Sequence, residues 1–287
     1  AHSHEHHHEH VHELTSLNKS FIIGITLNIL FVLVEFGIGF YYDSLGLLSD
    51  AGHNLGDVAS LVLAMLAFRL AKVHPNSRYT YGYKKSTVLV SLLNAVILLV
   101  AVGIIITESI GKLLHPTPVE GAAIAWTAGA GVVINAVTAW LFMKDKEKDL
   151  NVKGAYLHMA ADTLVSVGVV ISGIIIMYTG WTIVDPVIGL VIAVIIVIST
   201  WGLLHDSLRL SLDGVPVGID TEKIEQLILS QPGVVGYHHL HIWALSTTET
   251  ALTVHIVLDE MNHMEEAKHL IRHVLEDAGI HHITLEF

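Results

Sequence analysis

The chain has 287 residues, of which 52% are hydrophobic and only 15% are charged, and it contains 21 histidines and no cysteine. The low charged fraction indicates a membrane protein, since soluble domains carry about 25% charged residues. The lack of cysteine excludes disulfides, thiolate metal sites and cysteine nucleophiles, and the formal net charge of −12 argues against a nucleic-acid partner.

The chain begins with a histidine-rich segment, AHSHEHHHEHVHEL, in which seven histidines fall within the first twelve residues. Histidine-rich tracts bind metal ions without a fixed fold. We therefore expect residues 1–16 to form a disordered tail that collects metal ions. The alternative is a tail that has no role.

Six apolar segments follow, and each is long enough to cross about 30 Å of hydrocarbon as a helix of roughly 20 residues. They cover residues 21–40, 46–70, 87–113, 121–143, 154–178 and 184–206. Lysine and arginine occur in the second and fourth links and at both flanks, but not in the first, third and fifth links. By the positive-inside rule both termini lie in the cytosol. We therefore expect a six-helix transmembrane domain over residues 17–208.

Two of these segments carry the same pair of ionisable residues. His53 and Asp57 lie four apart in SDAGHNLGDVASL, and His158 and Asp162 lie four apart in HMAADTLVSVG. Residues four apart share one helix face, and ionisable residues at membrane depth are costly and by default functional. The helical rise places both pairs roughly 9–17 Å below a membrane surface, so that they overlap near the middle. Two imidazoles and two carboxylates are four N and O ligands, as a tetrahedral Zn²⁺ requires.

The alternative role for polar residues in membrane helices is hydrogen bonding between helices. We favour metal binding for the doubled pair because its spacing recurs, and helix–helix hydrogen bonding for single polar residues of the other spans. Those residues are Asn28, Glu35, Asn94, Glu108 and Asn135. Asn54 is intermediate, because it adjoins His53 and either packs between helices or supports a ligand.

Residues 209–287 differ from the apolar region, since they are acidic and contain nine of the histidines. Helical periodicity and strand alternation predict the order αββαβ of a small ferredoxin-like domain. The predicted elements cover residues 220–231, 237–245, 251–258, 265–278 and 280–287. Regular alternation places His239, His241 and His255 on one face of the sheet and His238 on the other.

The chain resembles the cation diffusion facilitators, and is similar above all to their bacterial zinc-exporting branch. The resemblance rests on SLGLLSDAGHNLGDVASL, RYTYGYKKSTVLVSLLNA, HMAADTLVSVGVV, DPVIGLVIAVIIV and HLHIWAL. It implies an α-helical membrane protein with six spans, a C-terminal cytosolic domain of metallochaperone type, a homodimer and exchange of metal for protons. The family's transport ligands map onto His53, Asp57, His158 and Asp162.

The resemblance also implies a metal site in the cytosolic domain. His238, His241 and His255 match family positions, and Glu286 lies where some relatives place a C-terminal ligand. Because alternation separates His238 from His255, the period and the resemblance disagree at this site. His74 falls in a loop where some relatives hold another metal site, although a lone histidine there is also an ordinary loop residue.

We therefore expect a secondary transporter, not an enzyme, in the bacterial inner membrane. It exports Zn²⁺ in exchange for protons by alternating access, because Zn²⁺ binds only neutral imidazole and ionised carboxylate and so releases protons. Its partners are divalent metal ions, protons, the lipid bilayer and a second copy of the chain, with Zn²⁺ as substrate and as regulatory ligand. Two alternatives stay open: a carrier of cadmium, cobalt, iron or manganese, and a membrane metal sensor in which binding only signals.

Overall fold

The computed structural model of the chain describes the backbone of residues 5–41, 45–115 and 122–287. Within these ranges the described side chains exclude residues 5–18, 39, 45–50, 53, 122–128, 169, 173 and 177. The chain divides into two compact units. The membrane unit runs to Arg69 and again from Val90 to Leu204, and the C-terminal unit combines Leu70–Leu89 with His205–Phe287.

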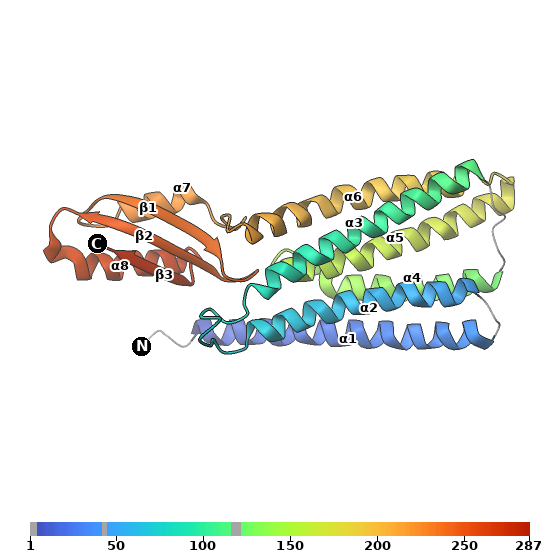
Figure 1. Ribbon diagram of the computed structural model, residues 1–287, viewed down its shortest axis with the longest axis horizontal. Helices are drawn as coiled ribbons and strands as arrows, with labels where there is room; N and C mark the ends of the chain where they lie inside the picture. Colours follow the sequence, from blue (N-terminus) through green and yellow to red (C-terminus); the bar gives the residue numbers. More distant parts are fainter. Residues whose placement is uncertain (1–4, 42–44, 116–121) are drawn as a thin grey trace. The chain divides into compact units, whose positions relative to one another are not determined.

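Six long helices dominate the described part of the chain before residue 212 (Figure 1). They are α1 (Glu5–Tyr41), α2 (Leu45–Ala71), α3 (Ser86–Leu114), α4 (Ala122–Met143), α5 (Leu150–Thr179) and α6 (Val184–Ser211). Five contain a stretch long and apolar enough to cross a membrane: Lys19–Ile38, Asn54–Ala71, Ser86–Leu114, Leu150–Ile176 and Val184–Ser211. The described side chains of α4 add a shorter apolar stretch, Gly129–Met143. These helices confirm the predicted α-helical membrane fold.

The first helix begins earlier than the sequence predicts. Residues 1–16 are expected to lack a fixed fold, whereas α1 already begins at Glu5. Extending an existing helix is much easier than nucleating one, so the apolar span allows the helix to continue back into the preceding His- and Glu-rich residues. The first four residues and the side chains of all seven tail histidines lie outside the described part of the chain.

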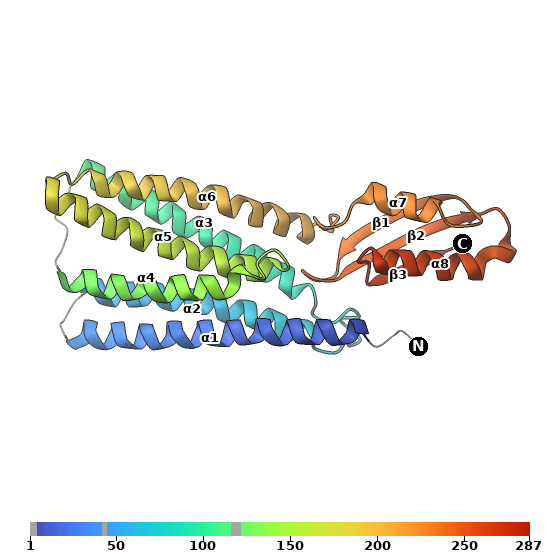
Figure 2. The same ribbon diagram turned by 180° about the vertical axis from the view of Figure 1, so that it is seen from behind.

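The membrane unit is built around two apolar cores that share α5. Val58 and Leu61 of α2 lie in the first core with Met159 of α5 and Phe21 of α1. The second core joins α5, through Ala161, to α3 and α6. In both views α1, α2 and α4 run beside one another, as do α3, α5 and α6 (Figure 2). The first core therefore holds α2 against α5.

The C-terminal unit contains a three-stranded sheet with helices packed on it (Figure 1). Its elements are α7 (Thr221–Leu229), β1 (Val234–Ala244), β2 (Thr250–Leu258), the short 3-10 turn Met261–His263, α8 (Met264–Asp277) and β3 (His282–Glu286). The strand order is β1-β2-β3, with β1 and β2 antiparallel and β2 and β3 parallel. This arrangement confirms the predicted αββαβ order.

Alternation along β2 decides which residues the helices cover. Leu252, Val254 and Ile256 are buried in one core with Ile228 of α7 and Ile271 of α8. Successive strand residues point to opposite faces, so His255 lies on the face of β2 that the helices leave open. Asp220 caps the start of α7, because its Oδ1 accepts a hydrogen bond from the Lys223 backbone N–H at 3.3 Å.

The first strand contains a β-bulge that regular alternation does not predict. His238 pairs with His255, and the next paired residue, His241, faces Thr253. Between these two pairs β1 advances three residues while β2 advances two, so β1 has one extra residue. His239 lies in this bulge and has a positive φ of 52°. The expectation that His238 and His255 lie on opposite faces is therefore wrong: they are direct partners across the strands.

The C-terminal unit also includes the loop between α2 and α3, which several contacts attach to the small domain. Lys85 Nζ donates to Asp213 Oδ1 at 2.6 Å and to the backbone oxygens of Leu210 and Ala244 at 2.9 and 3.0 Å. Lys84 forms an ion pair with Glu249. Lys84 and Lys85 therefore attach the end of this loop to the rest of the C-terminal unit.

Candidate metal sites

The two membrane pairs meet through one short contact between α2 and α5. Asp57 Oδ1 of α2 lies 2.7 Å from His158 Nε2 of α5. Both residues are buried, with exposed fractions of 1% and 5%. Asp162 Oδ2 lies 3.8 Å from the same imidazole nitrogen. One ligand atom from each of these three residues falls within 4.8 Å of the others, which is compatible with a shared metal ion.

Local sequence explains why these faces meet. Asp149 caps the start of α5, since its Oδ1 accepts hydrogen bonds from the backbone N–H groups of Asn151 at 2.7 Å and Val152 at 3.3 Å. Apolar residues then recur every three or four positions and pack into the core shared with α2. They are Val152, Ala155 and Met159 on α5, and Val58, Leu61, Ala64 and Phe68 on α2. The apolar stripes bring the adjoining Asp57 and His158 together.

His53, the fourth predicted ligand, lies on α2 one helical turn before Asp57. Its side chain is outside the described side chains. The structure therefore brings together three of the four predicted transport ligands.

The chemistry of this cluster suits a proton-sensitive cation site. When His158 Nε2 is protonated, it donates to the Asp57 carboxylate at 2.7 Å. When it is deprotonated, the same nitrogen and the nearby carboxylate oxygens are ligand atoms for a divalent cation. A metal ion bound by these atoms would compete with a proton for them, in a buried position where an ionisable group without a counter-charge is costly.

Several single polar residues join helices, as the sequence predicts for them. Asn28 of α1 donates from Nδ2 to Thr138 Oγ1 of α4 at 3.1 Å. Asn54 of α2 donates from Nδ2 to Glu35 Oε2 of α1 at 2.6 Å. Glu108 of α3 differs from them, because its side chain is exposed in the membrane unit. The first two contacts confirm the expected helix–helix hydrogen bonding.

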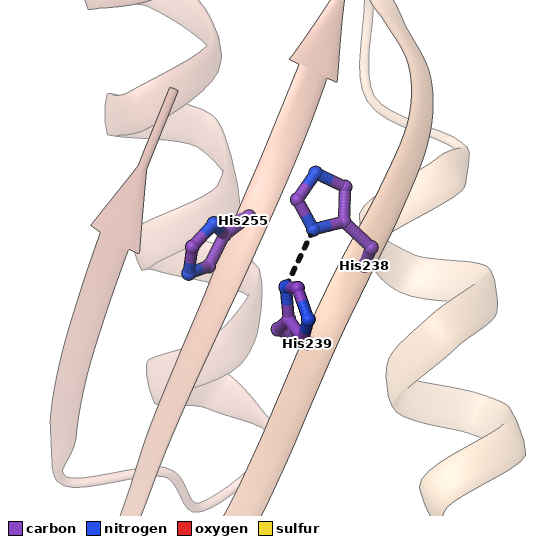
Figure 3. Close-up of side chains that lie close together, drawn as sticks. All are labelled: His238, His239 and His255. Atoms are coloured by element: carbon purple, nitrogen blue, oxygen red, sulfur yellow. Dashed lines mark hydrogen bonds between the residues drawn. The ribbon is translucent and has the colours of Figure 1, made fainter.

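A second cluster lies on the open face of the C-terminal sheet. His238, His239 and His255 have ring centroids 4.9 to 5.0 Å apart, and their candidate ligand nitrogens lie within 4.8 Å of one another. His238 Nδ1 lies 2.8 Å from His239 Nδ1, and the three rings converge between β1 and β2 (Figure 3). The bulge at His239 is what brings two consecutive histidines to one side of the strand.

Of the other predicted ligands of this domain, Glu286 lies beside the cluster and His241 does not. Glu286 of β3 pairs in register with His255, and its Oε2 lies 3.4 Å from His255 Nε2. His241 lies opposite Thr253, beyond the bulge, and is not in the cluster. His239 replaces it. Regular alternation already places His239 on the face of His255. It does not predict that His238 joins them, because consecutive residues share a face only where the strand is bulged.

His74 is exposed in the loop between α2 and α3. Among the described residues it belongs to no group of three metal-binding side chains. Within the described part of the chain, the groups of this kind are the membrane cluster of Asp57, His158 and Asp162 and the sheet cluster of three histidines.

Comparison with known proteins identifies both the six-helix part of the chain and its C-terminal part. Residues 21–210 match the family model of the cation efflux transmembrane domain, and residues 216–285 match the cation efflux protein cytoplasmic domain. The chain is 34% identical to the zinc transporter ZitB of Escherichia coli, over 100% of this chain and 92% of the relative. It is 34% identical to the cadmium, cobalt and zinc/H(+)-K(+) antiporter of Bacillus subtilis, over 89% and 84%. It is 36% identical to the metal cation efflux system protein CzcD of Cupriavidus metallidurans, over 94% and 86%.

Proposed function

Because this chain belongs to the cation diffusion facilitator family of cation efflux transporters, we propose that it exports Zn²⁺ from the cytosol in exchange for protons. The contact that carries the proposal is the 2.7 Å approach of Asp57 Oδ1 to His158 Nε2 between α2 and α5. The same nitrogen and carboxylate oxygens serve as proton sites in one state and as metal ligands in the other.

The proposed transport site consists of His53, Asp57, His158 and Asp162. Three of them are supported by the cluster of ligand atoms within 4.8 Å, and His53 by its place one turn from Asp57 on α2. Two nitrogen and two oxygen ligands suit tetrahedral Zn²⁺ better than Mg²⁺ or Mn²⁺, which prefer oxygen alone.

Proton coupling follows from the ligand chemistry. Zn²⁺ binds to neutral imidazole and ionised carboxylate, so binding from the cytosol releases protons and protons on the opposite side displace the metal. Because α2 and α5 share one core, we propose that they move as a unit when the site changes the side from which it is accessible. An inward proton gradient then drives the metal outward.

We propose that the chain lies in the bacterial inner membrane with both termini in the cytosol, as its lysines and arginines indicate. The division into a tail of residues 1–16, a transmembrane domain of 17–208 and a cytosolic domain of 209–287 belongs to the same proposal. The tail collects metal for the site. The cytosolic domain forms the contact between two copies in a homodimer and binds a regulatory Zn²⁺ through His238, His239 and His255, with Glu286 beside them.

Zinc flux into proteoliposomes under an imposed pH difference tests this function. We expect Zn²⁺ to move against the direction of proton flow, and reversal of the pH difference to reverse the net flux. Flux that ignores the pH difference contradicts proton exchange. Binding of Zn²⁺ without any flux favours a membrane metal sensor instead.

A second candidate is a carrier of another divalent metal. It is favoured by relatives whose names include cadmium and cobalt as well as zinc. Competition separates the two: we expect an excess of Zn²⁺ to suppress flux of Cd²⁺ or Co²⁺ more strongly than the reverse. Equal or opposite competition favours the broader carrier.

A further inference from the structure

We propose that Glu35 of α1 is a positioning residue for the transport site and acts through Asn54 of α2. This inference rests on the proposed transport function of Asp57 and His158. Asn54 adjoins His53 and lies three residues before Asp57, so it belongs to the helical turn that carries both α2 ligands. Glu35 is on a helix that supplies none of the proposed ligands.

The contact between the two residues is short and buried. Asn54 Nδ2 donates to Glu35 Oε2 at 2.6 Å, and the exposed fractions of the residues are 6% and 0%. A carboxyl group at this depth of a membrane helix is costly and is retained where it has a function. A hydrogen bond to an ionised acceptor is shorter and stronger than one between neutral groups. Glu35 therefore fixes the direction of the Asn54 side chain.

The helix that carries Glu35, α1, is itself held against α4 by three contacts. Asn28 of α1 donates to Thr138 of α4 at 3.1 Å. Phe31 of α1 packs on α4 at Gly131, where an added Cβ would meet the Phe31 ring at 3.2 Å. The ring of Phe21 lies 4.8 Å from that of Phe142, centroid to centroid. These contacts make α1 a fixed reference for the rotation of α2.

The consequence for the metal site is geometric. Rotation of α2 about its axis moves the Asp57 carboxylate relative to His158, and their atoms must stay within reach of one cation. The bond to Glu35 opposes that rotation at the ligand turn itself. Groups that orient metal ligands from behind typically change metal affinity or activity about 10- to 100-fold when they are removed. We expect an effect of that size for this pair.

The test compares four variants of the full-length protein in proteoliposomes: Glu35→Ala, Glu35→Gln, Asn54→Asp and the double variant Glu35→Gln with Asn54→Asp. For each, the equilibrium Zn²⁺ dissociation constant and the KM and maximal rate of Zn²⁺ flux are measured at one pH. Glu108→Gln is the matched control, because it removes an exposed carboxylate of the membrane unit.

We expect Glu35→Ala to weaken Zn²⁺ binding and raise KM about 10- to 100-fold. Glu35→Gln keeps an acceptor oxygen and stays within about threefold of the native chain, because neutral acceptors lose only part of the bond strength. Asn54→Asp places two carboxylates face to face and weakens binding. Adding Glu35→Gln to it restores binding, because the amide introduced on α1 donates to the carboxylate introduced on α2 in a reversed bond.

Unchanged binding in Glu35→Ala overturns the inference, as does failure of the double variant to restore what Asn54→Asp loses. Intact Zn²⁺ binding with abolished flux in Glu35→Gln also overturns it, since that result makes Glu35 a proton carrier. If Glu35→Ala does not fold, the inference is tested by whether the double variant restores the Zn²⁺ binding that Asn54→Asp loses. Loss of Zn²⁺ flux in the native chain, or full flux in Asp57→Ala, is a failure of the proposed transport function and not of the Glu35 contact alone.

Discussion

Asp57 of α2 and His158 of α5 are 101 residues apart in the chain, and their side chains meet at 2.7 Å inside the membrane unit. The contact joins a face of α2 to a face of α5. In the function that we propose, a proton and a metal ion compete for these atoms, and metal binding is therefore sensitive to pH.

Acidification should weaken Zn²⁺ binding at the membrane site. Each proton that must leave for the metal to bind lowers the apparent affinity about tenfold per pH unit once the free ligand is protonated. Isothermal titration in buffers of different ionisation enthalpy measures the number of protons released. The control is Glu108→Gln, which should release the same number as the native chain. A dissociation constant that does not change between about pH 6 and pH 8, the range in which histidine titrates, contradicts this account.

The bulge in β1 predicts an unequal effect of two histidines. His239→Ala should weaken Zn²⁺ binding to the C-terminal unit by at least about tenfold, because it removes a ligand from the three-histidine cluster. His241→Ala should leave binding unchanged, since His241 lies opposite Thr253 outside the cluster.

Binding is measured on full-length protein that also carries Asp57→Ala and Asp162→Ala, so that the membrane site does not contribute. The reverse order, with His241→Ala the more damaging, is expected of the ligand set that the family resemblance implies, and it would contradict a site made of His238, His239 and His255.

The two adjacent lysines of the α2–α3 loop should differ in their contribution to stability. Lys85 donates to three acceptors in the C-terminal unit, Asp213 and the backbone oxygens of Leu210 and Ala244. Lys84 has one partner, Glu249, and both are partly exposed, so that pair contributes about 1 kcal/mol or less. Removal of the Lys85 amine takes the donor from three acceptors at once. Because Lys85 is itself partly exposed and water can replace the amine, the loss should be about 1–2 kcal/mol, larger than that of Lys84.

Thermal unfolding of Lys85→Ala and Lys84→Ala, followed by a probe in the C-terminal unit, measures the difference. The charge-reversed pair Lys84→Glu with Glu249→Lys should recover the Tm that each single reversal loses. Equal losses for the two alanine variants speak against the three-acceptor contact.

The pair of His263 and Asp259 should give the C-terminal unit a pH-dependent contact. The hydrogen bond and charge of Asp259, 3.0 Å from His263 Nδ1, hold the pKa of His263 above its ordinary value. The same hydrogen bond, with one from the Glu260 backbone N–H, holds the pKa of Asp259 below its ordinary value. The His263 contribution is fully present below its unfolded-state pKa of about 6.5 and is lost as pH rises through the folded value. The Asp259 contribution is lost as pH falls through its lowered pKa.

Asp259→Asn should therefore bring the pKa of His263 down toward the value of a free histidine. Titration of the His263 ring protons by NMR measures this change, with the native chain as the reference. A His263 pKa that is the same in both proteins contradicts the ion pair.

Features that depend on hydropathy and helical spacing can be predicted from the sequence here. The apolar spans and the αββαβ order are of this kind, as is the placement of Asp57 and Asp162 at equal spacing from a histidine. Each depends on residues close together in the chain. For Asp57 and Asp162 the membrane environment strengthens the prediction, because a charged residue in an apolar span has few alternative explanations.

Features that depend on backbone irregularity or on a choice of partner cannot be read from spacing. The bulge at His239 changes the face of every residue on one side of it, and no alternation pattern marks it beforehand. The partner of Glu35 is equally hidden, since a buried carboxylate predicts a donor but not that the donor is Asn54. The start of α1 at Glu5 reflects helix propagation from the apolar span, not the local composition.

The most direct test of the central claim is Zn²⁺ flux in proteoliposomes for the native chain, Asp57→Ala and Asp162→Ala, with Glu108→Gln as control. If the α2–α5 cluster carries the metal, both alanine variants lose flux by at least about 100-fold while the control stays near the native rate. Flux of native size in both alanine variants would contradict the account.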